Sequence, residues 1–317
     1  MAERGFRHEA LLYAGEDAFL AGTVPFIRDA VASGEAIMVA VNSERIELLK
    51  SRLNGEADRV RFVDMREIGR NPALIIPAWQ DFVTEQAAGG KPFRGIGEPI
   101  CAERGAAELA ECHHHESLLN HAFNGGPSWW LLCPYDIESL DAAAVEGAER
   151  NHPLIYQDGV ERESGAYQEP AATSAPFAGR LPEPPVDAEE LAFDSPGDLE
   201  ETRRFVADHA IGEGIDHERA DGLALAVDEV VTNALRHGGG EGTVRAWGQD
   251  GGVVCEVTDG GTIRDPMVGR VRPGLTRHGG RGLWIANHFC DLMQIRSSKG
   301  RTVIRCHVRP LTTTVPA

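Results

Sequence analysis

The chain of 317 residues has little of what would assign it quickly to a membrane-spanning or nucleic-acid-binding class. It has no apolar run of about 18 residues that would span a bilayer, and no basic-then-apolar signal near its start. The cysteines are scattered without a Cys-x-x-Cys pair and are expected to be reduced. Lys and Arg number 31 against 49 Asp and Glu, so the net charge of −18 argues against a nucleic-acid partner. These absences predict a cytoplasmic protein without direct contact to membrane or nucleic acid.

What the sequence does contain is a break in composition between two globular parts. Prolines recur through the segment 157–192, for example in Leu181-Pro182-Glu183-Pro184-Pro185. Because proline interrupts helices and central strands, this segment is expected to be an extended, semi-rigid linker. It would join an N-terminal domain, 6–156, to a C-terminal domain, 193–310, and the total length suits two domains.

The N-terminal domain alternates short apolar segments with longer amphipathic ones. Strands are expected at 10–13, 36–41, 60–64, 93–98 and 129–136, and helices at 18–33, 43–53, 72–88 and 105–124. Such alternation predicts a parallel α/β sheet whose ligand site lies at the carboxyl ends of the strands. The domain contains no Gly-x-x-x-x-Gly-Lys-Ser/Thr phosphate loop.

The C-terminal domain has a different order of elements. Helices are expected from about 199 and over 217–235, with Ser195 as a cap and Pro196 in the first turn. Strands follow near 243–248, 252–258, 290–297 and 302–308. This order predicts an α+β domain with helices on one face of a mixed sheet.

Three motifs in the C-terminal domain carry the chemistry. Glu229 and Asn233 stand at i and i+4 and share one face of a helix, where a carboxylate can orient a nucleophile and an amide oxygen can bind Mg²⁺. Asp259 follows a strand and precedes glycines, so it can accept a hydrogen bond from an adenine amino group. Gly280 and Gly282 open a helix, whose N–H groups bind phosphate. Their order and spacing predict an ATP site.

Over about 190–310 these motifs resemble the GHKL ATPases, and among them the anti-sigma-factor serine kinases of the RsbW and SpoIIAB type. The resemblance implies a Bergerat ATP-binding sandwich in which Glu229 is the catalytic base and Asn233 the Mg²⁺ ligand. It also implies that Asp259 reads adenine beside Gly261. The other residues expected to bind the nucleotide are His237, Arg277, Gly280, Gly282 and Leu283.

Two features of this region leave alternatives open. His237 would either approach the phosphates or simply favour the negative end of its helix. The arginines of the expected ATP lid, Arg277 among them, suit triphosphate oxygens but would also be at home in solvent. Where the related proteins often read Asp-x-Gly-x-Gly, the last position here is Ile263, which loosens one hinge of the lid and bears on nucleotide affinity.

The N-terminal domain resembles the MEDS sensory domain, named from methanogen, methylotroph and DcmR proteins. The resemblance is carried by His8-Glu9-Ala10-Leu11-Leu12-Tyr13, by Arg94-Gly95-Ile96-Gly97-Glu98-Pro99, by 107–116 and by Leu131-Leu132-Cys133-Pro134-Tyr135-Asp136. It implies a sensor of an unknown small ligand on a degenerate RecA-like fold. The expected pocket residues are Tyr13, Glu98, His115, Glu116 and Tyr135.

The run 112–116, Cys-His-His-His-Glu, is a second concentration of ligand-type side chains. Cys112 and Glu116 share a helical face, and a thiolate with imidazoles suits zinc or another transition metal. Consecutive histidines on a helix point in different directions, however, so at most two of them share a site. Alternatively, His115 and Glu116 belong to the sensory pocket. Of Trp129 and Trp130, which alternate along a strand, one is expected in the core and the other in the core or at a pocket.

The leading hypothesis is a bacterial anti-sigma-type protein serine/threonine kinase that regulates transcription in a stress response. The resemblance implies that it phosphorylates a STAS-type antagonist with Mg-ATP, that the antagonist competes with a sigma factor, and that the N-terminal sensor controls it. Related kinases often pair, which allows a homodimer. The second hypothesis is a non-catalytic ATP-binding switch that sequesters a sigma factor or another partner. A sensor histidine kinase would need a helical dimerisation segment where the proline-rich linker stands.

Overall fold

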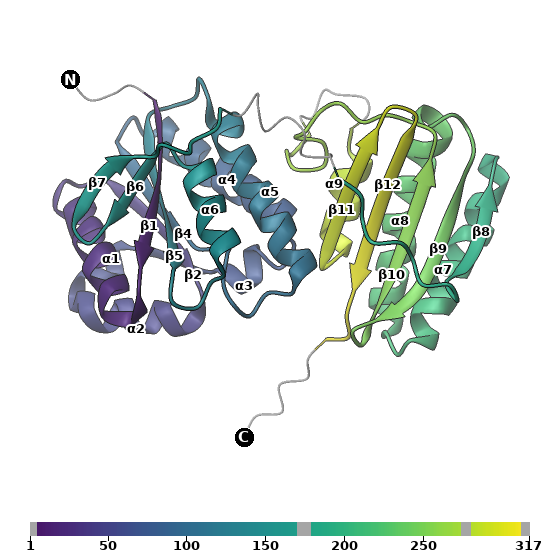
Figure 1. Cartoon of the computed structure of the whole chain (residues 1–317), viewed down its shortest axis with the longest axis horizontal. Helices are drawn as coiled ribbons and strands as arrows, with labels where there is room; N and C mark the ends of the chain where they lie inside the picture. The colour runs from purple at the N-terminus through teal and green to yellow at the C-terminus, as the bar shows by residue number, and fades with distance from the viewer. Residues whose placement is uncertain (1–4, 170–178, 274–279, 312–317) are drawn as a thin grey trace. The chain divides into compact units, whose positions relative to one another are not determined.

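The computed structural model describes residues 5–169, 179–273 and 280–311, and the chain divides into two compact units, Met1–Ser174 and Ala175–Ala317. The expected fold class is confirmed, with a largely parallel α/β unit followed by an α+β unit (Figure 1). All six cysteines are free thiols. Over the three described ranges, no helix combines the length and apolarity needed to cross a bilayer.

The first unit is built on a seven-stranded sheet in the order β3-β2-β4-β5-β1-β6-β7. Six strands are parallel, and β7 runs antiparallel to β6. The strands are β1 (Phe6–Tyr13), β2 (Ala36–Val41), β3 (Arg61–Asp64), β4 (Phe93–Gly97), β5 (Trp129–Asp136), β6 (Leu154–Gln157) and β7 (Val160–Glu163).

Helices cover both faces of this sheet. Alternate side chains of β1 point to opposite faces, so Leu11 packs with α1 and α2 while His8 contacts α5. The ring of Trp79 on α4 lies against the backbone of β4, where a Cβ on Gly95 would come within 2.6 Å of it. The helices are α1 (Gly15–Ala32), α2 (Ser43–Leu53), α3 (Met65–Ile68), α4 (Ile75–Ala88), α5 (Ala106–Phe123) and α6 (Ala142–Asn151).

The second unit contains a five-stranded sheet in the order β11-β12-β10-β9-β8, with every pairing antiparallel. The expectation of a mixed sheet is therefore wrong. For the pairs β9–β10 and β11–β12 the physical reason lies in the short turns, since strands joined by two residues must run antiparallel. Its elements are β8 (Glu189–Phe193), α7 (Leu199–Gly212), α8 (His217–His237), β9 (Gly242–Gln249), β10 (Gly252–Asp259), α9 (Gly282–Phe289), β11 (Leu292–Ser298) and β12 (Arg301–Val308).

Both ends of the proline-rich segment carry structure that the sequence did not suggest. At one end, Asp158 and Gly159 adopt positive φ and turn β6 into β7, which extends the first sheet. At the other, β8 pairs with β9, and the side chain of Arg305 on β12 donates a hydrogen bond to the carbonyl of Pro182. The segment before β8 therefore lies across the face of the sheet that α7 and α8 do not cover (Figure 1).

Candidate functional site

A cavity of about 200 Å³ lies in the second unit between α8, the end of β10 and the first turn of α9. The core face of α8 fixes this helix on the sheet through buried residues such as Val227, Val230 and Val231. Glu229 and Asn233, the polar residues beside these positions on α8, therefore lie at the edge of the core. The cavity is lined by Val230, Asn233, Ala234, His237, Gly238, Asp259, Gly261, Thr262, Ile263, Val268, Gly280, Gly282, Leu283, Thr302 and Ile304.

Glu229 and Asn233 point from α8 towards the beginning of α9. A Cβ placed on Gly282 would come within 2.7 Å of Glu229 Oε2 and 2.9 Å of Asn233 Nδ2. A larger residue at this position would require both side chains to shift. A carboxylate, an amide and the free N–H groups of a helix N-terminus therefore meet at one point, which is an arrangement suited to Mg²⁺ and phosphate.

Asp259 lies at the end of β10 and lines the same cavity. Its Oδ1 accepts a hydrogen bond of 2.6 Å from the backbone N–H of Gly261. Burial raises the pKa of this carboxyl group, and the hydrogen bond from Gly261 opposes the shift only in part. The Thr302 hydroxyl, paired in register with Asp259, donates to the carbonyl of Gly261 over 3.2 Å. These groups form a polar end to a cavity that Ile304, Leu283 and Val268 otherwise line with apolar surface.

The beginning of the expected lid is attached to the body of the unit. The backbone N–H of Ile263 donates to Ser297 Oγ over 2.8 Å, and its half-buried side chain packs against the hydrophobic core. Further along, the side-chain amide of Asn287 on α9 donates to the carbonyls of Gly269 and Leu283 at 3.0 and 3.1 Å. The structure thus shows Ile263 as an anchor, so the expectation that this position loosens a hinge of the lid is wrong.

The other predicted nucleotide-binding residues fall around the same cavity. His237, Gly280 and Leu283 line it. Glu229 is not among the lining residues and lies one helical turn before Asn233. Arg277 lies outside the described residues. Thr262 and Thr302 also line the cavity but were not predicted. Thr262 directly follows Gly261 in the sequence, whereas the only signal for Thr302 is its register with Asp259, which is not readable from one strand alone.

In the first unit, Tyr13 and Glu98 meet at the carboxyl ends of β1 and β4. The Tyr13 hydroxyl donates to Glu98 Oε1 over 2.8 Å, and both side chains are buried. Arg45 on α2, which was not predicted as a pocket residue, forms an ion pair with Glu98 and lies 3.8 Å from Asp136. Its guanidinium also lies 5.1 Å from the centre of the Tyr13 ring. Burial raises the pKa of Tyr13 despite this nearby positive charge.

The remaining predicted sensor residues lie on the opposite face of the sheet. Glu116 is a fully buried residue of α5, and His115 Nε2 lies 3.9 Å from its Oε1. Tyr135 on β5 stacks edge-on against His152, with ring centres 5.5 Å apart. The predicted pocket residues therefore form two separate groups. Tyr13 and Glu98 lie on one face of the sheet, and His115, Glu116 and Tyr135 lie on the other. Cys112 Sγ donates to the carbonyl of Pro99 over 3.3 Å.

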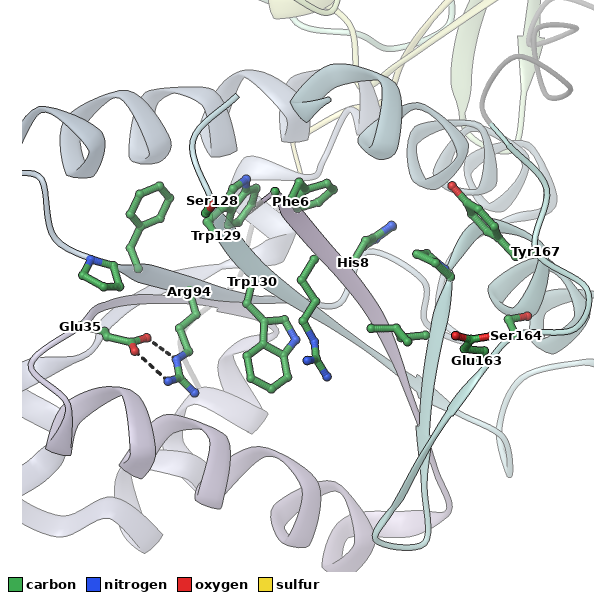
Figure 2. Close-up of a pocket in the computed structure, with 16 residues that line it drawn as sticks. Phe6, His8, Glu35, Arg94, Ser128, Trp129, Trp130, Glu163, Ser164 and Tyr167 are labelled. Atoms are coloured by element: carbon green, nitrogen blue, oxygen red, sulfur yellow. Dashed lines mark hydrogen bonds and ion pairs between the residues drawn. The ribbon is translucent and has the colours of Figure 1, made fainter. Parts of the chain in front are cut away.

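A larger cavity of about 610 Å³ opens at the amino ends of β1, β4 and β5, away from the strand ends where a ligand was expected (Figure 2). Arg94 forms a two-point ion pair with Glu35 in its wall, at 2.5 and 2.9 Å. The indole of Trp130 lies between the guanidinium groups of Arg94 and Arg7, at 5.3 and 3.9 Å. Trp129 also lines this cavity, and its ring packs against Phe123 and other aromatic rings of the core.

Comparisons with known proteins match two parts of the chain to two different family models. Residues 7–153 match the model of the MEDS family, the methanogen/methylotroph, DcmR sensory domain, and residues 194–307 match that of the histidine kinase-like ATPase domain. The recognition of both domains from the sequence is confirmed. The chain is thus a regulatory protein of the ATPase or kinase type, and its ATPase domain implies ATP binding, usually with Mg²⁺.

One solved structure that the chain resembles contains the RsbU and RsbW domains of Rv1364c from Mycobacterium tuberculosis. The sequences are 22% identical, and the TM-score is 0.30. The aligned part covers 39% of this chain and 33% of that one, so the chain spans about a third of its length. A comparison with curated proteins finds no significant match.

Proposed function

We propose that the chain is a signal-responsive kinase of the anti-sigma type, which transfers the γ-phosphoryl group of ATP to a serine or threonine of a small STAS-type antagonist. The observation that supports it is the convergence of Glu229 and Asn233 on Gly282, at the N-terminus of α9. The ATPase-domain match over 194–307 supports the nucleotide. The choice of antagonist and sigma factor as partners rests on the resemblance of the motifs to the RsbW and SpoIIAB kinases.

In this proposal, different parts of the cavity bind the adenine and the phosphates of the nucleotide. The adenine amino group donates to Asp259 at the polar end, and the phosphates lie against the first turn of α9. Asn233 would hold Mg²⁺, which neutralises charge on the phosphates when bound. The amide oxygen that would bind the ion lies near the first turn of α9, 3.6 Å from the position of a Cβ on Gly282.

The role proposed for Glu229 is that of general base. The partner's hydroxyl oxygen forms a bond to the γ-phosphorus, the bond between that phosphorus and the β–γ bridging oxygen breaks, and ADP leaves. The hydroxyl proton passes to the Glu229 carboxylate. Its position one turn before Asn233 keeps the base beside the phosphates rather than beside adenine.

The N-terminal unit is proposed to control this reaction as a sensor. The MEDS match over 7–153 supports a sensory role, and the cavity of about 610 Å³ offers space for a small molecule. Its aromatic and charged walls, with Trp130 held between two guanidinium groups, suit a ligand that has both polar and apolar parts.

Transfer of label from γ-³²P-ATP to candidate STAS-domain proteins tests the proposal. We expect labelled serine or threonine on one partner with the wild-type protein, and transfer by Glu229→Gln slowed by at least ~100-fold. Glu218→Gln is the matched control, because Glu218 lies exposed in the first turn of the same helix. Absence of transfer from the wild type to any partner, or equal rates for the two variants, would overturn the kinase proposal.

A non-catalytic switch is the second candidate, and Ile263 is the observation that favours it. Its backbone and side chain are both fixed, so the start of the lid has less freedom than a glycine would give. ATP would then stabilise one partner-binding form without being consumed. If Glu229→Gln binds ATP and regulates its partner in cells as the wild type does, this second function holds.

A further inference from the structure

Four potential metal ligands converge in the core of the first unit, from parts of the chain that are far apart in sequence. They are His8 on β1, Glu116 on α5, Cys133 on β5 and His152, which directly follows α6. One donor atom from each lies within 4.8 Å of every other. All four residues are at most 1% exposed.

The spacing of these donors is that of metal ligands rather than of hydrogen-bonded pairs. Glu116 Oε2 lies 3.4 Å from both His8 Nε2 and His152 Nε2. A hydrogen bond to a buried carboxylate is expected at about 2.7–2.9 Å, and neither oxygen of Glu116 has a hydrogen-bond partner among the described residues. In a tetrahedral zinc site with metal–ligand distances of about 2.0–2.3 Å, neighbouring ligand atoms lie about 3.3–3.6 Å apart.

The thiol completes the same pattern. Cys133 Sγ lies 3.4 Å from His8 Nε2, a distance that suits two ligands of one ion as well as a thiol–imidazole contact. Small side-chain rotations would bring the widest pair of donors, now within 4.8 Å, to the separation of tetrahedral ligands.

The orientation of His152 supports ligation through its Nε2. Its Nδ1 lies 2.8 Å from the carbonyl of Ala148, which can only accept a hydrogen bond, so Nδ1 carries the proton. In a neutral imidazole the lone pair is then on Nε2, which faces Glu116 and has no hydrogen-bond partner among the described residues. A backbone carbonyl that fixes the tautomer in this way is the usual second contact of a metal-binding histidine.

The charges of these side chains also favour a bound divalent cation. A carboxylate removed from water costs several kcal/mol unless it is paired and hydrogen-bonded. A divalent cation bound by one thiolate, one carboxylate and two neutral imidazoles forms a site with no net charge. Such a site buries these four side chains together without a net charge.

We infer that His8, Glu116, Cys133 and His152 bind one zinc ion in the core of the sensory unit. The mixed nitrogen, oxygen and sulfur donors favour zinc over magnesium or calcium, which take oxygen ligands. With four protein ligands the site is closed and therefore structural, and it fastens α5 and the end of α6 to the sheet. His8 also lines the cavity of about 610 Å³, so the ion lies next to the wall of the candidate ligand pocket.

The site is tested on the full-length protein, expressed with added Zn²⁺ or Co²⁺ and purified without oxygen. We expect one metal ion per chain by elemental analysis. The cobalt form should show d–d absorption of a tetrahedral ion and a thiolate-to-cobalt charge-transfer band. X-ray absorption of the wild-type zinc form should give one sulfur at about 2.3 Å and three nitrogen or oxygen ligands at about 2.0–2.2 Å. This measurement needs no variant and no ATP, so it is independent of the kinase proposal.

Two cysteine variants assign the sulfur ligand. Cys133→Ser should abolish the charge-transfer band, whereas Cys112→Ser should keep it, since Cys112 is an equally buried thiol of the same unit that bonds to Pro99 instead. His152→Gln should lower the metal content at least tenfold. The inference is overturned if the wild type holds no stoichiometric metal, if its zinc has no sulfur ligand, or if Cys133→Ser and His152→Gln retain the ion unchanged.

Discussion

The carboxylate of Asp259 accepts a hydrogen bond of 2.6 Å from the backbone N–H of Gly261, two residues further along the chain. This bond fixes one oxygen of the carboxylate at the end of β10 while the side chain stays half-buried in the cavity wall. The carboxylate is therefore preorganised as an acceptor before any nucleotide arrives. Its position relative to Glu229 and Asn233 sets the direction in which a nucleotide would lie.

The raised pKa of Asp259 predicts that nucleotide binding depends on pH. Burial is the main cause of the increase, so the carboxyl group takes up a proton at a higher pH than an exposed aspartate does. Because an adenine amino group donates to the charged form, nucleotide affinity should fall as the pH is lowered through this pKa. Titrations of ADP at a series of pH values should show the decrease for the wild type and a flatter profile for Asp259→Asn. An identical pH profile for both proteins would contradict the assignment.

Gly282→Ala should weaken ATP binding at least tenfold, about 1.4 kcal/mol, without unfolding the unit. The added methyl group would come within 2.7 Å of Glu229 and 2.9 Å of Asn233 and displace both from the first turn of α9. Gly212→Ala is the control, since a Cβ at this helical position meets nothing within 4 Å. Calorimetric titration measures the affinity, and circular dichroism verifies the fold. Equal affinities for the two variants would show that Gly282 is not beside the nucleotide.

Ile263→Ala should destabilise the second unit by about 1–2 kcal/mol, less than for a fully buried isoleucine, because Ile263 is half-buried against the core. Leu225→Ala, at a position 49% exposed on α8, should change stability by less than about 0.5 kcal/mol. Urea unfolding followed by circular dichroism distinguishes the two. A negligible change for Ile263→Ala would mean that this side chain does not anchor the lid.

Removing Arg305 should be costly because it leaves a buried carboxylate without its partner. Arg305 Nε donates to Glu256 Oε2 over 2.6 Å, and both side chains are nearly buried. Arg305→Met should destabilise the second unit by about 3–5 kcal/mol, and adding Glu256→Leu should recover most of that loss. Arg305→Met should also speed proteolysis near Pro182, whose carbonyl Arg305 binds. Unfolding curves and timed digestion measure the two effects, and a double variant no more stable than the single one would contradict this account.

Periodicity and helical spacing predicted the parts of the fold and site that depend on local sequence. The alternation of apolar segments located β1 to β5, and the i, i+4 spacing of Glu229 and Asn233 placed both on one face of α8. The hairpins at Asp158-Gly159 and Asp250-Gly251 were readable in principle, since both dipeptides adopt the positive φ values of a two-residue turn. The strands on either side of Asp250-Gly251 were predicted, whereas those around Asp158-Gly159 were missed because they have only four residues each.

The remaining features depend on contacts between distant segments. His8 and His152 have ring centres 3.9 Å apart although 143 residues separate them, and no periodicity relates them. Arg45 reaches Glu98 only because α2 packs beside the end of β4. The metal-ligand run at 112–116 pointed to α5, but the partners of Glu116 come from β1, β5 and the end of α6. Tertiary packing decides such contacts, and a single sequence does not contain them in readable form.

Calorimetric titration of ATP into the full-length protein, with and without Mg²⁺, tests the central claim most directly. The account predicts one saturable site per chain that requires Mg²⁺, is lost in Asp259→Ala and is weakened at least tenfold in Asn233→Ala. Glu218→Gln should bind as the wild type does. Absence of binding at millimolar ATP, or binding that neither Asp259→Ala nor Asn233→Ala reduces, would contradict it.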